Sequence, residues 1–337
     1  MKMFKISAIA IACMFVVGLM TLHPQEASAK QVVIKLAHPN VPEHPMGQGF
    51  EYFKEILETR SDGRFRVDIY DSSKFGNFDS VVQGLQTGML QMGSASTPNL
   101  APFSDDFLIF DMPFLFPSYE ASDLITDGPI GRQASSALEE TGIFGLGYIE
   151  IGFRHLFNSK RPIIKLEDAK GLKIRATSSK AHLATLKGMG VNPTPIAWGE
   201  VYTALQQGTV DGIDIDLNLA WFNNFHEVNE NLTLVGSLYS PHLVMISKVF
   251  YESLVPVDQI MIVECFAEMK LFQRNKIRSN EEMIIEKMRE KGVNIQVLSP
   301  EERKRFAEAT KYVYAEFEER IGKELIERAR KTLQGSE

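Results

Sequence analysis

The most informative part of the chain reads GFRHLFNSKRPI at residues 152–163, EDAKGLKIRA at residues 167–176 and PTPIAWGEVYTALQQGTVDGIDID at residues 193–216. Within it, Leu172–Ala176 has the apolar character of a buried strand, and a helix is expected at about residues 179–188. Strands that alternate with helices are typical of an α/β architecture.

The same alternation extends upstream. Residues 65–69 (FRVDI) alternate between apolar and polar side chains, which predicts a half-buried strand, and residues 61–63 (SDG) form a turn in front of it. Residues 33–37 and 143–149 are further strand candidates. The C-terminal third is mostly helical, with an N-cap at Ser299. We therefore expect an α/β fold with largely parallel sheets.

The three segments quoted above resemble, in order and spacing, the solute-binding proteins of tripartite ATP-independent periplasmic (TRAP) transporters. Residues 61–70 (SDGRFRVDIY), 85–88 (LQTG) and 112–116 (MPFLF) extend the resemblance over the mature chain. The resemblance implies the two-lobed periplasmic binding protein fold, an α/β fold with a hinge and a ligand cleft between the lobes.

The function and the domain division follow from the same resemblance. Family members capture a small organic anion and deliver it to membrane subunits that an ion gradient drives. We expect lobe I at residues 30–151 plus about 241–280, lobe II at residues 152–240 plus about 281–330, and a monomer. The sequence leaves open whether the solute is a carboxylate, a sulfonate or a phosphate ester.

The N-terminus has the pattern of a secretory signal peptide at residues 1–29. Two lysines precede an apolar stretch, residues 6–22, and Ala27-Ser28-Ala29 forms a small-x-small cleavage site. An uncleaved membrane anchor is the alternative, but the stretch is short for a span of about 20 residues. We expect cleavage after Ala29 and a periplasmic location.

Composition excludes several other classes of protein. Removal of the signal peptide changes the formal net charge from −7 to −8, and an acidic surface repels nucleic acid. The mature chain keeps one cysteine, Cys265, which cannot form an internal disulfide. His38 and His44 lack the spacing of zinc ligands. We expect no metal and no cofactor.

Two arginines are the first candidates for binding an anion. The resemblance places Arg175, in the KIR strand, in a paired contact with the solute carboxylate, because a planar guanidinium offers two parallel donors. Arg154, in GFR, matches a second family arginine, which either binds the anion or supports Arg175. Trp198 matches an aromatic residue that packs on the solute or belongs to the core.

The chain departs from the family pattern at one place. Many relatives read DGQEN where this chain reads DGIDI, so Ile215 replaces an asparagine that donates to the carboxylate. Asp214 and Asp216 flank Ile215, and a strand would send both to the opposite face. Either aspartate balances an arginine or accepts a hydrogen bond from the solute.

The first lobe supplies the other candidate ligand-binding residues. His38 ends the first strand, Ser96 and Thr97 end the MGSAST segment, and Phe78 lies near another family contact. Each of these four residues has a structural role as its alternative.

A secreted hydrolase or lyase that acts on a small organic acid is the main alternative function. It would need a nucleophile with a base, or paired carboxylates. No Gly-x-Ser-x-Gly motif is present, and Asp214 and Asp216 lie in a segment that the resemblance explains. A sensor with the same binding lobes is a third alternative. We predict a binding protein and not an enzyme.

Overall fold

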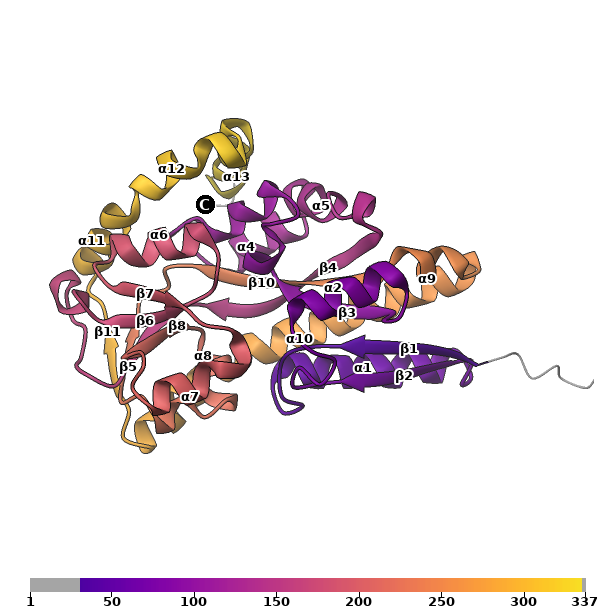
Figure 1. The fold of residues 1–337 in the computed structure, drawn as a ribbon, viewed down its shortest axis with the longest axis horizontal. Coiled ribbons are helices and arrows are strands. Elements are labelled where there is room, and N and C mark those ends of the chain that lie inside the picture. The colour runs from indigo at the N-terminus through magenta and orange to yellow at the C-terminus, as the bar shows by residue number, and fades with distance from the viewer. Residues whose placement is uncertain (1–30, 335–337) are drawn as a thin grey trace, which may run out of the picture.

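The computed structural model describes residues 31–334, and the predicted signal peptide at residues 1–29 lies outside them. Two β-sheets, each covered by helices, form two halves of the molecule. The first half is built on the sheet that contains β1, and the second half on the sheet that contains β5; they lie on the right and the left of Figure 1.

The first sheet has the strand order β2-β1-β3-β10-β4 and the second has the order β11-β9-β5-β8-β6-β7. The strands of the first sheet are β1 (Val32–Ala37), β2 (Phe65–Tyr70), β3 (Met92–Ser96), β4 (Ile143–Phe153) and β10 (Tyr239–Ser247). Those of the second sheet are β5 (His155–Asn158), β6 (Lys173–Ala176), β7 (Asn192–Pro195), β8 (Gly212–Ile215), β9 (Asn231–Leu234) and β11 (Asn294–Val297).

Helices fill most of the remaining described chain. The α-helices are α1 (Pro45–Arg60), α2 (Phe78–Thr87), α3 (Thr97–Leu100), α4 (Tyr119–Thr126), α5 (Pro129–Ser136), α6 (Lys180–Gly188), α7 (Val201–Gln206), α8 (Leu217–Phe222), α9 (Lys248–Ser253), α10 (Pro256–Glu290), α11 (Pro300–Thr310), α12 (Tyr312–Ile321) and α13 (Lys323–Gln334). The 3-10 helices are η2 (Asp105–Asp111), η3 (Glu139–Thr141), η4 (Leu166–Ala169), η5 (Trp198–Glu200) and η6 (Phe225–Glu227). Within residues 31–334, no helix is both long and apolar enough to cross a membrane.

The predicted α/β fold is confirmed, but both sheets are mixed. In the described chain, β10 runs antiparallel to β3 and β4, and β5 runs antiparallel to β8 and β9. The strands β5 and β10 each begin directly after the chain has crossed from the other sheet. The sequence-based expectation of largely parallel sheets misses them because a crossing leaves no mark in the apolar pattern of a single strand.

Within residues 31–334, the chain passes from one sheet to the other at three places. Arg154 is the single residue between β4 of the first sheet and β5 of the second, and residues 235–238 connect β9 back to β10. The long helix α10 forms the third connection, since it contacts α1 and β4 on one side and α8 on the other. The lobe boundaries at residues 151, 240 and 280 stay predictions; strands within residues 32–153 and 239–247 form the first sheet.

Two glycines of the central motifs have a steric explanation. Gly152, which precedes the first crossing, has φ +123°, a conformation that L side chains rarely adopt. At Gly212, an added Cβ would lie 2.2 Å from the main-chain oxygen of Phe157 on β5, so only glycine fits between the paired strands. The motifs GFR and DGID therefore fix the backbone on both sides of the crossing.

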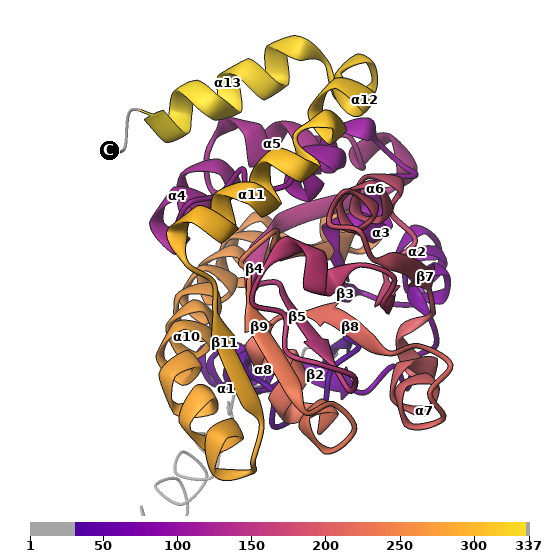
Figure 2. The same cartoon turned by 90° about the vertical axis from the view of Figure 1, so that its left-hand side faces the viewer.

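The C-terminal helices pack on both halves. The predicted N-cap is confirmed, because Ser299 Oγ accepts a hydrogen bond from the main-chain N–H of Glu302. The helix α11 contacts α6 in the second half, and α13 contacts α4 and η2 in the first half. Figure 2 shows the three helices α11–α13 along one edge of the molecule. Phe317 and Ile326, from α12 and α13, join the apolar core of the first half.

Candidate functional site

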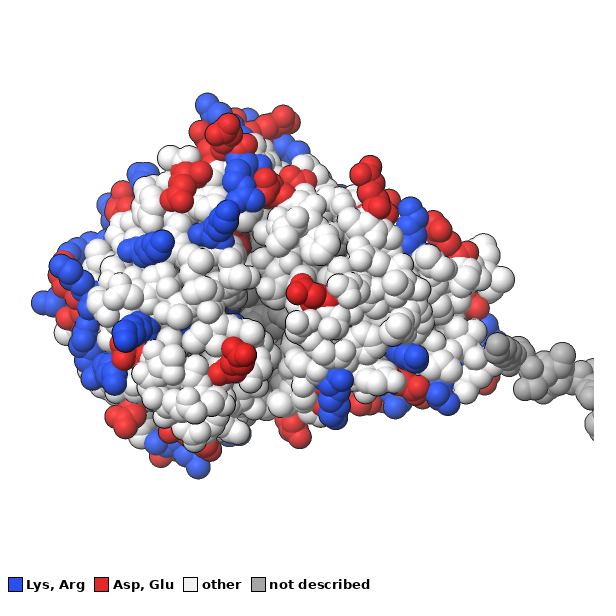
Figure 3. Space-filling model, in the orientation of Figure 1, with Lys and Arg blue, Asp and Glu red and all other residues white. Residues whose placement is uncertain are grey.

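A cleft of about 970 Å³ opens between the two halves. Figure 3 shows a hollow where the halves meet. The first half contributes uncharged polar residues, of which we call six the first wall: His38, Asn40, Ser94, Ser96, Asn99 and His242. The second half contributes the second wall, which includes Arg154 at the crossing, Arg175, Thr177, Trp198 and Ile215. Residues that are far apart in the sequence therefore form one site.

Arg175 is a buried cation on the second wall. It lies on β6, and the residue is 6% exposed. Nε and Nη2 donate hydrogen bonds to the main-chain oxygen of Ile196, at 3.0 and 2.8 Å, and the guanidinium lies 5.7 Å from the ring centre of Trp198. No described residue forms an ion pair with Arg175. Its Nη1 group and one N–H of Nη2, which are two parallel donors, stay available.

The electrostatics of Arg175 reflect this missing partner. Burial and, to a smaller extent, the neighbouring positive charge of Arg154 lower the pKa of Arg175 to about 9, although Asp214 partly offsets both effects. The charged form is thus held at a cost in free energy, because a guanidinium normally keeps a pKa above 12. A bound anion would remove this cost by pairing with the charge.

Arg154 lines the same wall but is already paired. Its Nε donates to Asp214 Oδ2 at 2.6 Å, its Nη2 donates to the main-chain oxygen of Asp214, and its Nη1 donates to Ser240 Oγ at 3.3 Å. Asp214 is on β8 of the second sheet and Ser240 on β10 of the first. Arg154 therefore ties both sheets together at the crossing, and its charge is largely neutralised.

Asp214 lies behind the cleft surface and accepts from a second residue, His182. The distance from His182 Nε2 to Asp214 Oδ2 is 2.8 Å, and Thr177 Oγ1 lies 2.8 Å from His182 Nδ1. Burial raises the pKa of Asp214, but Arg154 and His182 more than offset burial and bring it to about 2. Burial also lowers the pKa of His182. His182 was not predicted from sequence, because its role depends on a contact between β8 and α6.

Three other predicted ligand-binding residues do not line the cleft. Asp214 faces Arg154 and His182, as described. Asp216 caps α8, since its Oδ1 accepts from the main-chain N–H of Leu219 at 2.8 Å, and burial raises its pKa to about 7. Thr97 is fully buried at the start of α3. Ile215, which replaces the family asparagine, does line the cleft.

The first wall contains the predicted residues His38 and Ser96, and Phe78 lines the cleft beside them. His38 follows β1 and Ser96 ends β3, so both lie at the carboxyl ends of parallel strands, where α/β sheets bind ligands. His242 was missed. It lies opposite Ser96 on the neighbouring strand β10. A histidine within the otherwise apolar segment HLVMI was the signal that could have identified it.

Neither metal binding nor a disulfide is supported by the described residues. Among residues 31–334, no three His, Cys, Asp or Glu side chains are grouped so that they could hold a metal ion. Cys265 is a buried free thiol in this part of the chain.

A cleft between two α/β halves, with a buried arginine that lacks a partner, defines a binding protein for small anions. The sequence of residues 36–320 matches the family described as bacterial extracellular solute-binding protein, family 7. The chain belongs to this family.

Relatives of known structure or assigned ligand support this conclusion. The chain is 31% identical over 302 residues to the C4-dicarboxylate-binding periplasmic protein DctP of Rhodobacter capsulatus, which covers 89% of this chain and 90% of the relative. It is 30% identical to the galactonate complex of the sugar acid binding protein DctPAm of Advenella mimigardefordensis, with a TM-score of 0.89, covering 91% and 99% of the two chains. It is also 30% identical to a TRAP periplasmic solute-binding protein of Polaromonas sp. JS666 bound to D-erythronate, with a TM-score of 0.85, covering 89% and 98%.

These findings confirm the predicted family, fold and class of function. The family and its structural neighbours are solute-binding proteins of transporters and not enzymes, so the hydrolase or lyase alternative is not supported. The roles of the individual site residues stay predictions.

Proposed function

We propose that the mature chain binds one small organic anion in the cleft, releases it unchanged and thereby supplies membrane subunits of a TRAP transporter. The observation that carries this proposal is Arg175. A buried guanidinium without an ion pair is unfavourable in the empty protein, and it offers two parallel donors to a carboxylate. Trp198, beside this charge, would pack on the carbon skeleton of the solute.

Arg154 is proposed to position the anion site. Its pairing with Asp214 leaves less charge for a solute, but it lines the cleft beside Arg175. Asp214, Asp216 and Thr97 would act on the solute indirectly, by holding Arg154, α8 and α3 in place. His38, Ser96 and Phe78 would contact the part of the solute that lies away from Arg175.

The proposal includes location and motion. Cleavage after Ala29 would release a monomer into the periplasm, as the N-terminal pattern and the family membership suggest. The two halves would close on the solute about the three crossings. A solute stabilises the closed form only through contacts that the open form lacks.

The test is a thermal-shift screen of organic acids with the purified chain from residue 30 onward, followed by NMR of the mixture. A true ligand at 100 times its Kd should stabilise the native state by about 2.7 kcal/mol, and its spectrum should stay unchanged for a day. The Arg175→Ala variant is the control, and the same ligand concentration should stabilise it much less than the wild type. Steady conversion of the ligand, lost in Asp214→Asn or Asp216→Asn, would replace this proposal with an enzyme.

A further inference from the structure

The two walls of the cleft differ in charge. Four charged residues line the cleft: Arg154, Arg175, Asp79 and Glu200. Arg154 is paired with Asp214, so Arg175 alone offers an uncompensated positive charge. Lys74, near His38, is paired with Asp71 at 2.9 Å and does not line the cleft. The cleft can therefore compensate one carboxylate.

The first wall holds two buried histidines that lack partners. His38 is 2% exposed and its Nδ1 and Nε2 form no hydrogen bond; His242 is 8% exposed and its Nδ1 forms none. A buried polar group without a partner destabilises a protein, and a ligand that pairs with the group removes this penalty. Neither imidazole supports a neighbouring element through its ring nitrogens. This differs from His44, whose Nδ1 accepts from the N–H of Met46 and caps α1.

Both histidines are neutral at physiological pH. Burial is the main reason why the pKa of His38 is lowered to about 4. Asp71 raises this pKa and Lys74 lowers it, so their effects oppose each other. Burial and, to a smaller extent, His38 and Arg154 lower the pKa of His242 to about 3. A neutral imidazole has one donor and one acceptor, as a hydroxyl group has. A carboxylate can only accept, so its charge would stay uncompensated beside these rings.

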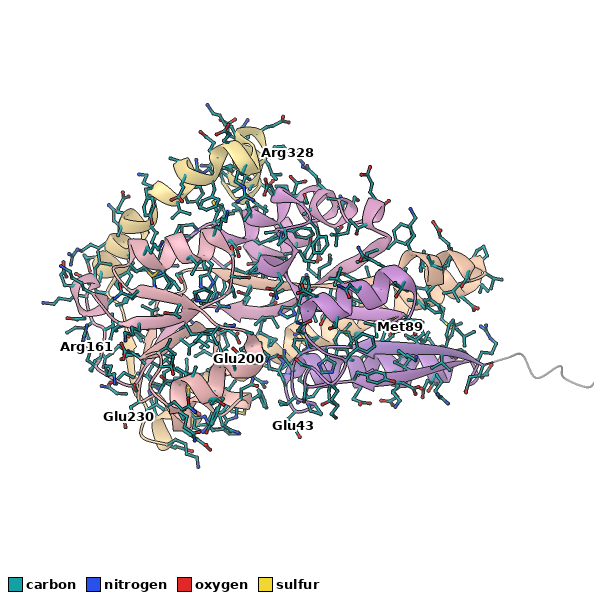
Figure 4. All side chains as sticks on the ribbon, in the orientation of Figure 1. Glu43, Met89, Arg161, Glu200, Glu230 and Arg328 are labelled. Atoms are coloured by element: carbon teal, nitrogen blue, oxygen red, sulfur yellow. The ribbon has the colours of Figure 1, made fainter. Side chains whose placement is uncertain are left out.

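The mouth of the cleft adds a second discrimination. Asp79 and Glu200 line it and are exposed, and Figure 4 labels Glu200 where the two halves meet. Around the hollow in Figure 3 the surface is mostly uncharged, and most lysines and arginines lie at the periphery of this face. A second negative charge on the solute would meet two acids and no free cation.

We propose that the first wall selects a solute whose far end is uncharged and hydroxylated, with His38 and His242 as the specificity-determining residues, and that dicarboxylates are rejected. This inference rests on the proposed function, because it assumes that Arg175 binds the single carboxylate. The solute is then a hydroxylated monocarboxylic acid.

The test compares three acids of six carbons by calorimetry at pH 7.5. Galactonate carries one carboxylate and hydroxyl groups, galactarate replaces its terminal CH₂OH with a second carboxylate, and hexanoate lacks hydroxyl groups. Galactonate should bind about 100-fold more tightly than either of the others, because a site built for hydroxyl groups rejects an analogue that leaves its polar groups unpaired. Erythronate, tartrate and butyrate form the corresponding four-carbon set, in case the cleft prefers a shorter chain.

Substitutions assign the discrimination to the two histidines. His38→Leu and His242→Leu should each weaken galactonate, or erythronate if the shorter set binds, about tenfold and leave the alkanoate unchanged or stronger. His242→Gln keeps a neutral donor and acceptor and should recover part of the loss. The matched control is His226→Leu, because His226 stacks on Trp221 outside the cleft and should affect neither acid. Circular dichroism and thermal melts confirm folding.

Three outcomes would overturn this inference and leave the proposed function intact. They are equal or tighter binding of galactarate or tartrate, equal losses for the hydroxylated acid and the alkanoate in the histidine variants, and galactarate binding that strengthens tenfold from pH 8 to pH 6, as an imidazolium would cause. In each of them Arg175→Ala would still weaken binding by about 30-fold or more, and the proposed function would stand. If no acid binds the folded wild type, or if Arg175→Ala binds as the wild type does, the proposed function fails and the inference fails with it.

Discussion

Two arginines in different parts of the molecule, the half-buried Arg278 and the buried Arg175, differ in their partners. On α10, Arg278 pairs with Glu150 at 2.8 Å and with Asp123 at 2.7 Å. On the second wall of the cleft, Arg175 pairs with no described acid and donates only to a main-chain oxygen. The arginine on α10 joins a helix to β4 and α4, whereas Arg175 joins nothing outside its own half. From this difference we expect Arg278 to stabilise the fold and Arg175 to bind the ligand.

Removal of Arg278 should have the largest effect, and the effect should be on stability. Arg278→Ala leaves Glu150, which is fully buried, without its cation, and breaking a buried pair costs roughly 3–5 kcal/mol. Burial already raises the pKa of Glu150 to about 7 despite Arg278. Without Arg278 this pKa should rise further, so the loss should be greater at pH 8 than at pH 6. Urea unfolding at both pH values measures it.

The affinity for the solute provides the control for that variant. Folded Arg278→Ala should bind the solute as the wild type does, since Arg278 does not line the cleft. A large loss of affinity with unchanged stability would reverse the assignment of the two arginines.

Removal of Arg175 should act on binding instead. Arg175→Ala leaves the carboxylate of the bound solute unpaired, which costs roughly 2–5 kcal/mol, or about 30-fold to several thousand-fold in affinity. The free energy of unfolding should stay the same or rise, because a buried charge without a partner has been removed. Calorimetry and urea unfolding on the same protein give both numbers.

Two further variants sharpen this result. Arg175→Lys keeps the charge but loses the fork of donors, so it should recover only part of the affinity. Arg154→Ala should cost less affinity than Arg175→Ala but more stability, because it leaves buried Asp214 with His182 in place of an arginine and a histidine. Binding of wild-type strength in folded Arg175→Ala would show that the anion is held elsewhere, and Arg154 would become the principal candidate.

The same comparison applies to buried carboxyl groups, with a smaller effect. Burial raises the pKa of Asp111 and of Asp216 to about 7, and no ion pair forms at either. Between about pH 4 and pH 7 the native state holds protons that the unfolded chain has lost, so stability should fall as the pH rises through this window. The slope is at most about 1.4 kcal/mol per pH unit for each group.

Urea unfolding at pH 5, 6 and 7 tests this expectation. Asp216→Asn should flatten the dependence and raise the free energy of unfolding at pH 7 by about 1 kcal/mol, since asparagine also caps helices well. Asp214→Asn is the opposite control: the pKa of Asp214 is lowered to about 2, so its ionised form stabilises the native state above about pH 4. A wild-type slope in Asp216→Asn would show that the group is ionised in the native state.

Much of the fold could be predicted because local sequence patterns, such as alternation and helix caps, determine many of its strands and helices. The alternating residues 65–69 lie in β2, and the cap at Ser299 begins α11. Local patterns do not contain the crossings, and these make β5 and β10 antiparallel. The break at Lys311 between α11 and α12 could not be predicted, because the buried residues from Phe306 to Ile321 keep a helical spacing through it.

The candidate site divides in the same way. Arg175 and Arg154 could be identified from their motifs, and both line the cleft. The partner of an arginine depends on tertiary contacts, so the ion pair between Arg154 and Asp214, 60 positions apart, could not be read from spacing. For His182 and His242 no motif exists, and their importance follows only from what surrounds them.

The single-residue crossing at Arg154 has a mechanical consequence for the order of events during binding. In a rotation, displacement grows with distance from the pivot, and β4 and β5 leave no slack at this point. Arg154 is itself the crossing and would move little, whereas the exposed Asp79 on α2 and Glu200 on η5 belong to elements away from it and would move more. A solute that enters would therefore find the anion site almost in its final geometry and would be anchored by its carboxylate first. The rest of the cleft would then close around the solute, whose carboxylate end is already bound.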